Sequence, residues 1–306
     1  MRGSTRYSPG LIPDACSLMP ETPALTDHFS TLASRYDAVL CDVWGVVHNG
    51  VRAHADACDA LARFRAGGGT VVLISNAPRP REWVVRSLDR LAVPRESYDG
   101  LATSGDVTRA FLKGHPGETV YLIGPERDHT IFDGLPIRFG AIEAADYCVC
   151  TGLFEDERET PDDYADILAG LRARKLFMVC ANPDLVVERG DKLVYCAGSI
   201  ADRYAHLGGE VLYAGKPHPP IYDEAFAQIL AVRGKEVPRA RVLAIGDSVR
   251  TDLTGATRAG IDCLFVTAGI HAEELGGRHA PDPNALAVIF ADAGAAPKAV
   301  MHRLVW

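Results

Sequence analysis

The sequence lacks any apolar stretch that approaches the ~18 residues required by a membrane-spanning helix. Its first residues, MRGSTRYSPGLIPDACSL, include basic side chains but no continuous apolar segment of the kind found in signal peptides. Basic residues are also outnumbered, since 32 Lys and Arg stand against 40 Asp and Glu, and the formal net charge is -8. A nucleic-acid coat or an anionic membrane surface would require a basic face. We therefore expect a soluble, cytoplasmic protein that binds neither nucleic acid nor membrane.

Several common cofactor patterns are missing as well. The eight cysteines include no CxxC pair and no Cys/His spacing of a zinc site. Several of them lie in apolar runs, where a buried free thiol is expected, and this indicates a reducing compartment. The phosphate-binding patterns GxGxxG and GxxxxGK[ST] do not occur. Their absence disfavours a dinucleotide enzyme or a P-loop nucleotidase.

Apolar, strand-like runs alternate with amphipathic, helix-like segments along most of the chain. The runs cover residues 38–44, 70–75, 119–124, 146–152, 175–184, 211–216, 241–247 and 263–269. Continuous apolar strands separated by helices are typical of a parallel sheet covered on both faces. The sequence therefore predicts an α/β fold with a Rossmann-like parallel sheet, and 306 residues are enough for two domains.

Polar residues that suit phosphoryl transfer end four of these runs. They are Asp42, Ser75, Asn76, Lys216 and Asp247, with Asp252 one helical turn after the last. In open α/β sheets the ligand lies beyond the carboxyl ends of the strands. Each residue alone has an ordinary explanation as a helix cap, a turn residue or a solvated side chain. Together they supply a nucleophilic carboxylate, donors for phosphoryl oxygens and an acidic cluster suited to Mg²⁺.

The segments DVWGVVHNG, ISN, GKPHPPIY and GDSVRTDLTGA resemble, in this order, the four motifs of the haloacid-dehalogenase-like (HAD) hydrolase superfamily. The resemblance implies a Mg²⁺-dependent hydrolase in which Asp42 is the nucleophile and forms an aspartyl-phosphate. It also implies that Ser75 and Asn76 bind the transferring phosphoryl group and that Lys216 is the catalytic lysine. The implied metal ligands are Asp42, Asp247, the backbone carbonyl of Trp44 and, in support, Asp252.

The segment between Asn76 and Lys216 is too long for a linker and has its own strand and helix pattern. It resembles the large α/β cap of the NagD-like branch (class IIA), including the sequence ANPD at 181–184. By that likeness Asn182 and Asp184 help to bind the substrate, and the cap is a candidate surface for homo-oligomerisation. The expected boundaries are an arm at 1–29, a core at 30–79 and 209–306, and a cap at 80–208.

Motif I departs from the family pattern at Trp44. Phosphatases of the superfamily usually read DxD there, and the second Asp is the acid for the leaving oxygen and the base for the hydrolytic water. This sequence has Asp42-Val43-Trp44. Losing a positioned acid and base typically costs about 10²- to 10⁴-fold in rate. His48 is the candidate replacement, with an ordinary loop histidine as the alternative, and Trp44 could form a pocket wall or simply pack.

Three functions stay open on the sequence alone. The first is a phosphatase for a small phosphorylated metabolite such as a nucleotide, a sugar phosphate or a phosphorylated cofactor, weakened for poor leaving groups by Trp44. The second is a regulatory protein that binds a phosphorylated ligand without efficient turnover. The third is metal-free dehalogenation by Asp42, for which the acidic residues Asp247 and Asp252 would have no use.

Overall fold

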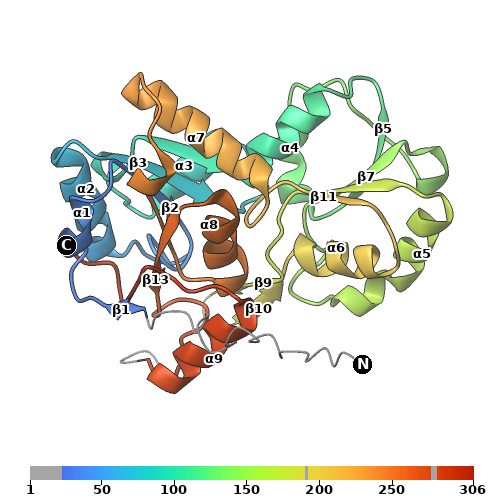
Figure 1. Ribbon diagram of the computed structural model, residues 1–306. Helices are drawn as coiled ribbons and strands as arrows, with labels where there is room; N and C mark the ends of the chain where they lie inside the picture. The colour runs from blue at the N-terminus through green and yellow to red at the C-terminus, as the bar shows by residue number, and fades with distance from the viewer. Residues whose placement is uncertain (1–22, 190–191, 277–280) are drawn as a thin grey trace, which may run out of the picture.

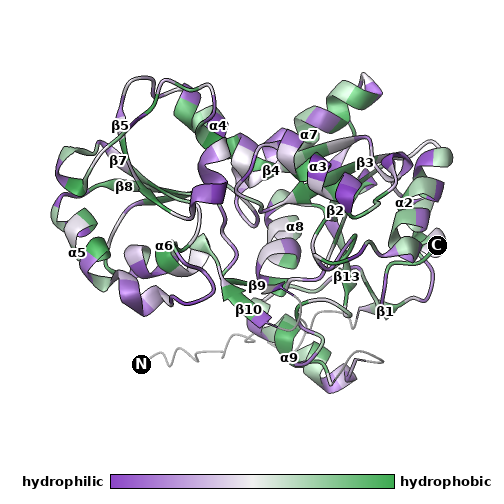
Figure 2. Ribbon diagram, turned by 180° about the vertical axis from the view of Figure 1, so that it is seen from behind, coloured by the Kyte–Doolittle hydropathy of each residue, from purple (hydrophilic) through white to green (hydrophobic). Residues whose placement is uncertain are grey.

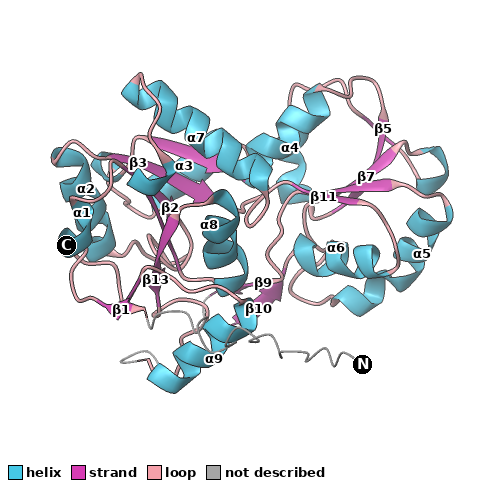
Figure 3. Ribbon diagram, in the orientation of Figure 1, coloured by secondary structure: helices cyan, strands magenta, loops and turns pink. Residues whose placement is uncertain are grey.

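The computed structural model describes residues 23–189, 192–276 and 281–306. A seven-stranded sheet forms the centre of one lobe, and its strand pairs are all parallel (Figures 1 and 3). In spatial order its strands are β1 (Ala24–Leu25), β14 (Ala299–Met301), β13 (Asp262–Val266), β12 (Val242–Gly246), β2 (Ala38–Asp42), β3 (Thr70–Ser75) and β4 (Gly100–Thr103). The predicted α/β class with a parallel sheet is confirmed.

Helices cover both faces of this sheet because successive strand residues point to opposite sides. In β2, Val39 and Cys41 pack on one face, and Ala38 and Leu40 pack on the other. The first face is covered by α1 (Ser30–Ala33), α2 (Ala55–Ala66) and α3 (Arg81–Arg90). The second is covered by α7 (Pro219–Arg233), α8 (Thr254–Ala259) and α9 (Pro283–Ala293). Helices such as α2 and α9 carry both hydrophobic and hydrophilic residues (Figure 2), as expected for elements with one buried face.

A second, five-stranded parallel sheet forms the other lobe (Figure 1). Its strands, in spatial order, are β11 (Val211–Tyr213), β8 (Phe177–Cys180), β7 (Tyr147–Cys150), β5 (Thr119–Ile123) and β6 (Arg138–Phe139). One face packs against α5 (Ala165–Ala173) and α6 (Ala197–His206), and the other packs against α4 (Ser104–Lys113). An antiparallel hairpin of β9 (Val186–Arg189) and β10 (Lys192–Tyr195) lies between β8 and α6 in the sequence.

Strand pairing divides the chain differently from the expected boundaries. Residues 80–103, expected in the cap, lie in the first lobe, because α3 packs on the first sheet and β4 pairs with β3. Residues 211–213, expected in the core, lie in the second lobe, because β11 pairs with β8. The inserted unit therefore runs from α4 to β11. A hydrophobic run predicts a strand but does not show which sheet the strand joins.

The N-terminal arm is also shorter than expected. β1 pairs with β14, and Phe29 is fully buried in the core. The ring of Phe29 lies 5.4 Å from that of Phe64 and 5.8 Å from that of Trp306. Residues 24–29 are therefore part of the first lobe, although their sequence has no clear periodicity. Residues 1–22, the rest of the expected arm, lie outside the described residues.

The described ranges contain neither a disulfide nor a membrane-spanning helix. Seven cysteines lie in these ranges, and all seven are free and buried. Burial raises the pKa of thiols such as Cys41 and Cys180, which keeps them protonated. No helix in the same ranges is long and apolar enough to cross a bilayer.

Truncation of Phe29 tests whether residues 24–29 belong to the core. We expect Phe29→Ala to lower the free energy of unfolding by about 3–5 kcal/mol, because it removes a fully buried aromatic side chain. Leu25→Ala is the matched control: Leu25 is 71% exposed, so its truncation should change the free energy by no more than about 0.5 kcal/mol. Urea unfolding measures both values, and equal stability of the two variants would contradict the packing of Phe29.

Candidate active site

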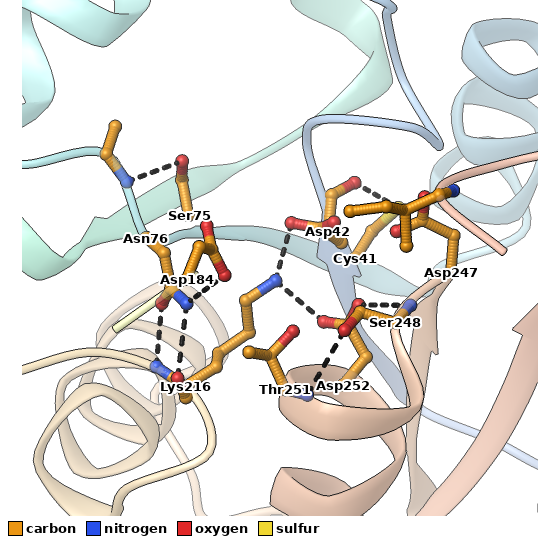
Figure 4. A network of polar contacts seen from close by, with 12 residues as sticks. Cys41, Asp42, Ser75, Asn76, Asp184, Lys216, Asp247, Ser248, Thr251 and Asp252 are labelled. Carbon is orange, nitrogen blue, oxygen red and sulfur yellow. Dashed lines mark hydrogen bonds and ion pairs between the residues drawn. The ribbon is translucent and has the colours of Figure 1, made fainter. Parts of the chain in front are cut away.

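Lys216 lies at the centre of a buried polar network at the carboxyl edge of the seven-stranded sheet (Figure 4). Its Nζ donates hydrogen bonds to Asp42 Oδ1 and to Asp252 Oδ1, each at 2.6 Å. Asp42 is the last residue of β2, and Asp252 lies in a π-helical turn, η6 (Val249–Leu253), that follows β12. The structure thus brings three of the predicted site residues into direct contact.

The electrostatics of this network favour a further cation. Burial alone would lower the pKa of Lys216, but the carboxylates of Asp252, Asp42 and Asp184 outweigh it, so the pKa is raised and the ammonium stays charged. Burial raises the pKa of Asp42, and repulsion by Asp252 adds to this, while Lys216 opposes both. Burial and the charge of Asp252 raise the pKa of Asp247 to about 7. One ammonium does not balance three carboxylates, and a divalent cation would.

The donor atoms fit magnesium. Asp42, Asp247 and Asp252 are buried, and each offers a carboxylate oxygen within 4.8 Å of the others. Mg²⁺ prefers such hard oxygen ligands. Both oxygens of Asp252 are engaged, one by Lys216 and one by the backbone N–H of Ser248 at 3.1 Å. Asp42 has one oxygen engaged by the described residues, so Asp42 and Asp247 are better placed than Asp252 for direct coordination.

The position of Asp247 depends on two glycines. A Cβ at Gly269 would lie 1.8 Å from Asp247 Oδ2, and a Cβ at Gly45 would lie 2.1 Å from the same oxygen. The N–H of Ile270 donates to this oxygen at 2.8 Å. Neither glycine was predicted to belong to the site. The signal in the sequence is a glycine at the end of the apolar run 263–269.

The side chain of Asn76 holds Lys216 and Asp184. Its Nδ2 donates to the carbonyl of Lys216 at 3.1 Å and to Asp184 Oδ1 at 2.9 Å, and its Oδ1 accepts from the backbone N–H of Lys216 at 2.7 Å. Both side-chain donors are therefore used. A contact between Asn76 and a phosphoryl oxygen, as expected from the sequence, would have to come from its backbone N–H, which donates no hydrogen bond within the described residues. The hydroxyl of Ser75 differs, since it accepts from the N–H of Ala77 at 3.2 Å and keeps its own proton to donate.

The loop after β8, which also carries Asn182, brings Asp184 from the second lobe to this network. Figure 4 shows Asp184 beside Asn76. Asn182 Oδ1 accepts from the backbone N–H of Asp184 at 3.1 Å. The N–H of Gly198, in the first turn of α6, donates to the carbonyl of Asp184 at 3.1 Å. Asp184 therefore enters the site as a carboxylate, and Asn182 supports its loop.

Trp44 and His48 pack against each other in the loop that follows β2. Their rings are edge to face, with centroids 5.1 Å apart, and the indole of Trp44 also lies against Gly50. His48 Nδ1 accepts from the N–H of Gly50 at 2.9 Å. Burial, with a smaller effect of His54, lowers the pKa of His48 to about 4. His48 is therefore neutral at pH 7, which argues against the predicted role as the replacement acid.

The backbone carbonyl of Trp44, expected to be a metal ligand, is compatible with that role in its geometry. Within the described chain the backbone carbonyl of Trp44 accepts no hydrogen bond, whereas the neighbouring carbonyl of Val43 accepts from Val47 and His48. The carbonyl of Trp44 is thus available as a metal ligand, independently of its side chain.

Two protein families match this chain. The family described as haloacid dehalogenase-like hydrolase matches residues 39–138, and one described as HAD-hydrolase-like matches residues 213–293. These ranges include Asp42, Ser75 and Asn76 in the first and Lys216, Asp247 and Asp252 in the second. A solved hydrolase of the haloacid dehalogenase-like family from Brucella suis 1330 is 44% identical, with a TM-score of 0.82. The match covers 92% of this chain and 100% of that one.

More distant relatives carry more specific names. A 5'-nucleotidase of Bacillus subtilis (strain 168) is 24% identical over 241 residues, which cover 78% of this chain and 90% of the relative. A glycerol phosphate phosphatase from Mycobacterium tuberculosis, solved in complex with magnesium, is 26% identical with a TM-score of 0.63. That match covers 89% of this chain and 76% of the other structure.

A methyl group at Gly269 should disturb the position of Asp247. We expect Gly269→Ala to weaken Mg²⁺ binding by about 10- to 100-fold, because the added Cβ would overlap the Asp247 carboxylate. Gly67→Ala is the control, since the nearest atom to its Cβ would be the Phe64 carbonyl oxygen at 3.4 Å. Titration calorimetry with MgCl₂ compares the two, and equal affinities would count against Asp247 as a ligand.

Proposed function

This chain belongs to the haloacid dehalogenase-like hydrolase family, and we propose that it is a Mg²⁺-dependent phosphatase for a small phosphorylated metabolite. The observation that carries the proposal is the buried contact of Lys216 with Asp42 and Asp252, beside Asp247. It places a nucleophilic carboxylate, a fixed cation and hard metal ligands together. The names of the nucleotidase and the glycerol phosphate phosphatase support a phosphorylated small molecule as substrate.

Each residue near Lys216 has a role in this proposal. Asp42 attacks phosphorus, the bond to the leaving oxygen breaks, and water later hydrolyses the aspartyl-phosphate. Lys216 orients Asp42 and offsets the charge of the phosphoryl group, to which the hydroxyl of Ser75 donates a hydrogen bond. Asn76 keeps Lys216 in place. Mg²⁺, held by Asp42, Asp247 and the carbonyl of Trp44, would neutralise charge on the phosphoryl oxygens.

We further propose that the inserted unit is a NagD-like cap that helps to choose the substrate. It lies between β4 and α7 in the sequence, and its loop after β8 reaches Asn76 through Asp184. The carboxyl ends of β5, β7 and β8 share one edge of the second sheet. Ligands of parallel sheets bind at such edges. Asp184, supported by Asn182, is a cap carboxylate that contacts Asn76 beside the proposed phosphate site.

Replacement of the nucleophile tests the reaction. We expect Asp42→Asn to lower Mg²⁺-dependent hydrolysis of 4-nitrophenyl phosphate by more than about 10³-fold while the chain still folds, because an amide of the same shape is a poor nucleophile. EDTA should abolish the activity of the unaltered protein. Asp37→Asn is the control, because it alters a more exposed carboxylate, paired with Arg241, at the other end of β2.

The same assay separates the alternative functions. Turnover retained by Asp42→Asn would remove Asp42 as the nucleophile. Tight binding of a phosphorylated ligand by the unaltered protein without turnover would favour the regulatory protein. Release of halide from a haloacid in the presence of EDTA would favour the metal-free dehalogenase.

The rate should depend steeply on the leaving group, because the loop after β2 carries Trp44 and a neutral His48 where an acid is needed. We expect aryl phosphates to be hydrolysed about 10²- to 10⁴-fold faster than alkyl phosphates. Trp44→Asp should reduce this ratio, whereas His48→Ala should leave it unchanged. Initial rates with 4-nitrophenyl phosphate and glycerol phosphate provide the measurement. Equal rates on both substrates in the unaltered protein would mean that another group donates the proton.

A further inference from the structure

One carboxylate in the cap contacts both segments that build the catalytic cluster. Asp202 lies in α6, and its Oδ2 accepts a hydrogen bond from Arg250 Nη2 at 2.9 Å. Its Oδ1 accepts from the hydroxyl of Tyr213 at 2.7 Å. Arg250 belongs to the first lobe, and Tyr213 ends the last strand of the second. The two oxygens of one side chain therefore connect different parts of the site.

The first partner, Arg250, lies within the loop that carries the proposed metal ligands. It falls between Asp247 and Asp252 in the turn η6. The same turn is held by Ser248, whose N–H bonds the carboxylate of Asp252 and whose Oγ accepts from the N–H of Thr251. This turn is short and internally hydrogen-bonded. A change in the position of Arg250 should therefore also change the backbone that positions Asp252.

The second partner, Tyr213, lies at the start of the segment that delivers Lys216. The phenol ring of Tyr213 stacks on the imidazole of His218, with centroids 4.5 Å apart and planes 7° apart. The N–H of His218 bonds the carbonyl of Gly215 at 2.9 Å. The two stacked residues therefore flank Lys216 in the sequence, one before it and one after it. Asp202 accepts a hydrogen bond from the hydroxyl of the stacked Tyr213 ring.

We infer that Asp202 is a positioning residue that holds the Asp247–Asp252 loop in register with Lys216 and thereby sets the affinity for Mg²⁺. This inference rests on the Mg²⁺ site of the proposed function. The side chains of Arg250 and Asp202 are 39% and 32% exposed. Ion pairs this exposed contribute little to global stability. We therefore expect loss of the Asp202–Arg250 ion pair to change the position of the loop from Asp247 to Asp252 more than the stability of the whole chain.

Asp202→Asn tests the inference in the full chain without substrate. We expect its dissociation constant for Mg²⁺, measured by calorimetry, to rise about 2- to 30-fold, the usual range for coupling through such contacts. Its melting temperature should shift by no more than about 4 °C. Arg203→Gln is the control, because the adjacent residue of α6 pairs with Asp162 inside the cap. This variant should bind Mg²⁺ like the unaltered protein.

A double-mutant cycle with Arg250→Met identifies the contact. Both substitutions remove the same ion pair, so their effects on Mg²⁺ affinity should not add. Unchanged affinity in Asp202→Asn, or additive effects, would overturn the inference. If Asp202→Asn does not fold, Tyr213→Phe provides the test, because it removes the other hydrogen bond to Asp202. A raised dissociation constant for Mg²⁺ in this variant would support the inference, and an unchanged one would overturn it.

The same titration distinguishes this inference from the proposed function. Calorimetry detects Mg²⁺ binding without turnover. An unaltered chain that binds Mg²⁺ but hydrolyses no phosphate ester would overturn the phosphatase proposal and leave the role of Asp202 to be decided by its variants. An unaltered chain that binds no Mg²⁺ would overturn both.

Discussion

The buried ammonium of Lys216 requires carboxylate partners, because an unpaired charge in the interior costs roughly several kcal/mol. Asp42 and Asp252 supply these partners at 2.6 Å. Asp42 in turn needs the lysine, since burial and repulsion by Asp252 raise the pKa of Asp42 and would otherwise favour its protonated form. The pairing of β12 with β2 sets the ends of these two strands side by side, so that Asp42 and the loop from Asp247 to Asp252 meet. The fold thus brings together an ammonium and carboxylates that stabilise one another in the interior. The negative charge that Lys216 does not balance favours a divalent cation.

Three side-chain contacts between the lobes share one chemical pattern, in which the second lobe supplies an aspartate and the first lobe supplies the donor. Asp184 accepts from Asn76, Asp202 accepts from Arg250, and Asp128 accepts from Arg79 at 3.1 Å. Asp128 is buried in the turn after β5, at the same sheet edge as the loop that carries Asp184. Polar contacts of this kind orient two surfaces without the large apolar area of a permanent interface. They suit the proposed role of the second lobe as a cap, with a position linked to the geometry of the loops around Lys216.

The limits of sequence reasoning follow from what a hydrophobic pattern encodes. The apolar runs identified the parallel sheet, and the rule for strand ends placed Asp42 and Asp247 at one edge. The pattern did not show that β11 pairs with β8, so Lys216 reaches the site from a strand of the other sheet. It also gave the side-chain amide of Asn76 a ligand-binding role, because the sequence shows an amide at a strand end but not the Asp184 carboxylate and the Lys216 carbonyl that occupy its donors. Pairing partners and hydrogen-bond saturation are properties of the folded chain.

The loop after β2 is shaped around the indole of Trp44. Gly50 has a φ of +83°, and a Cβ there would lie 2.7 Å from two atoms of that indole. The N–H of Gly50 also fixes the ring of His48, which packs edge to face with Trp44. A short carboxylate at position 44 would leave the space at Gly50 unfilled, and vacated space in a packed loop is costly. Trp44 therefore has a packing role that the surrounding residues support. In the proposed reaction the nucleophile and the metal carboxylates would not depend on this side chain, so the chemistry that the loop would give up is proton transfer to the leaving oxygen. Selection of substrates would then rest on the acidity of the leaving group as well as on its fit beneath the proposed cap.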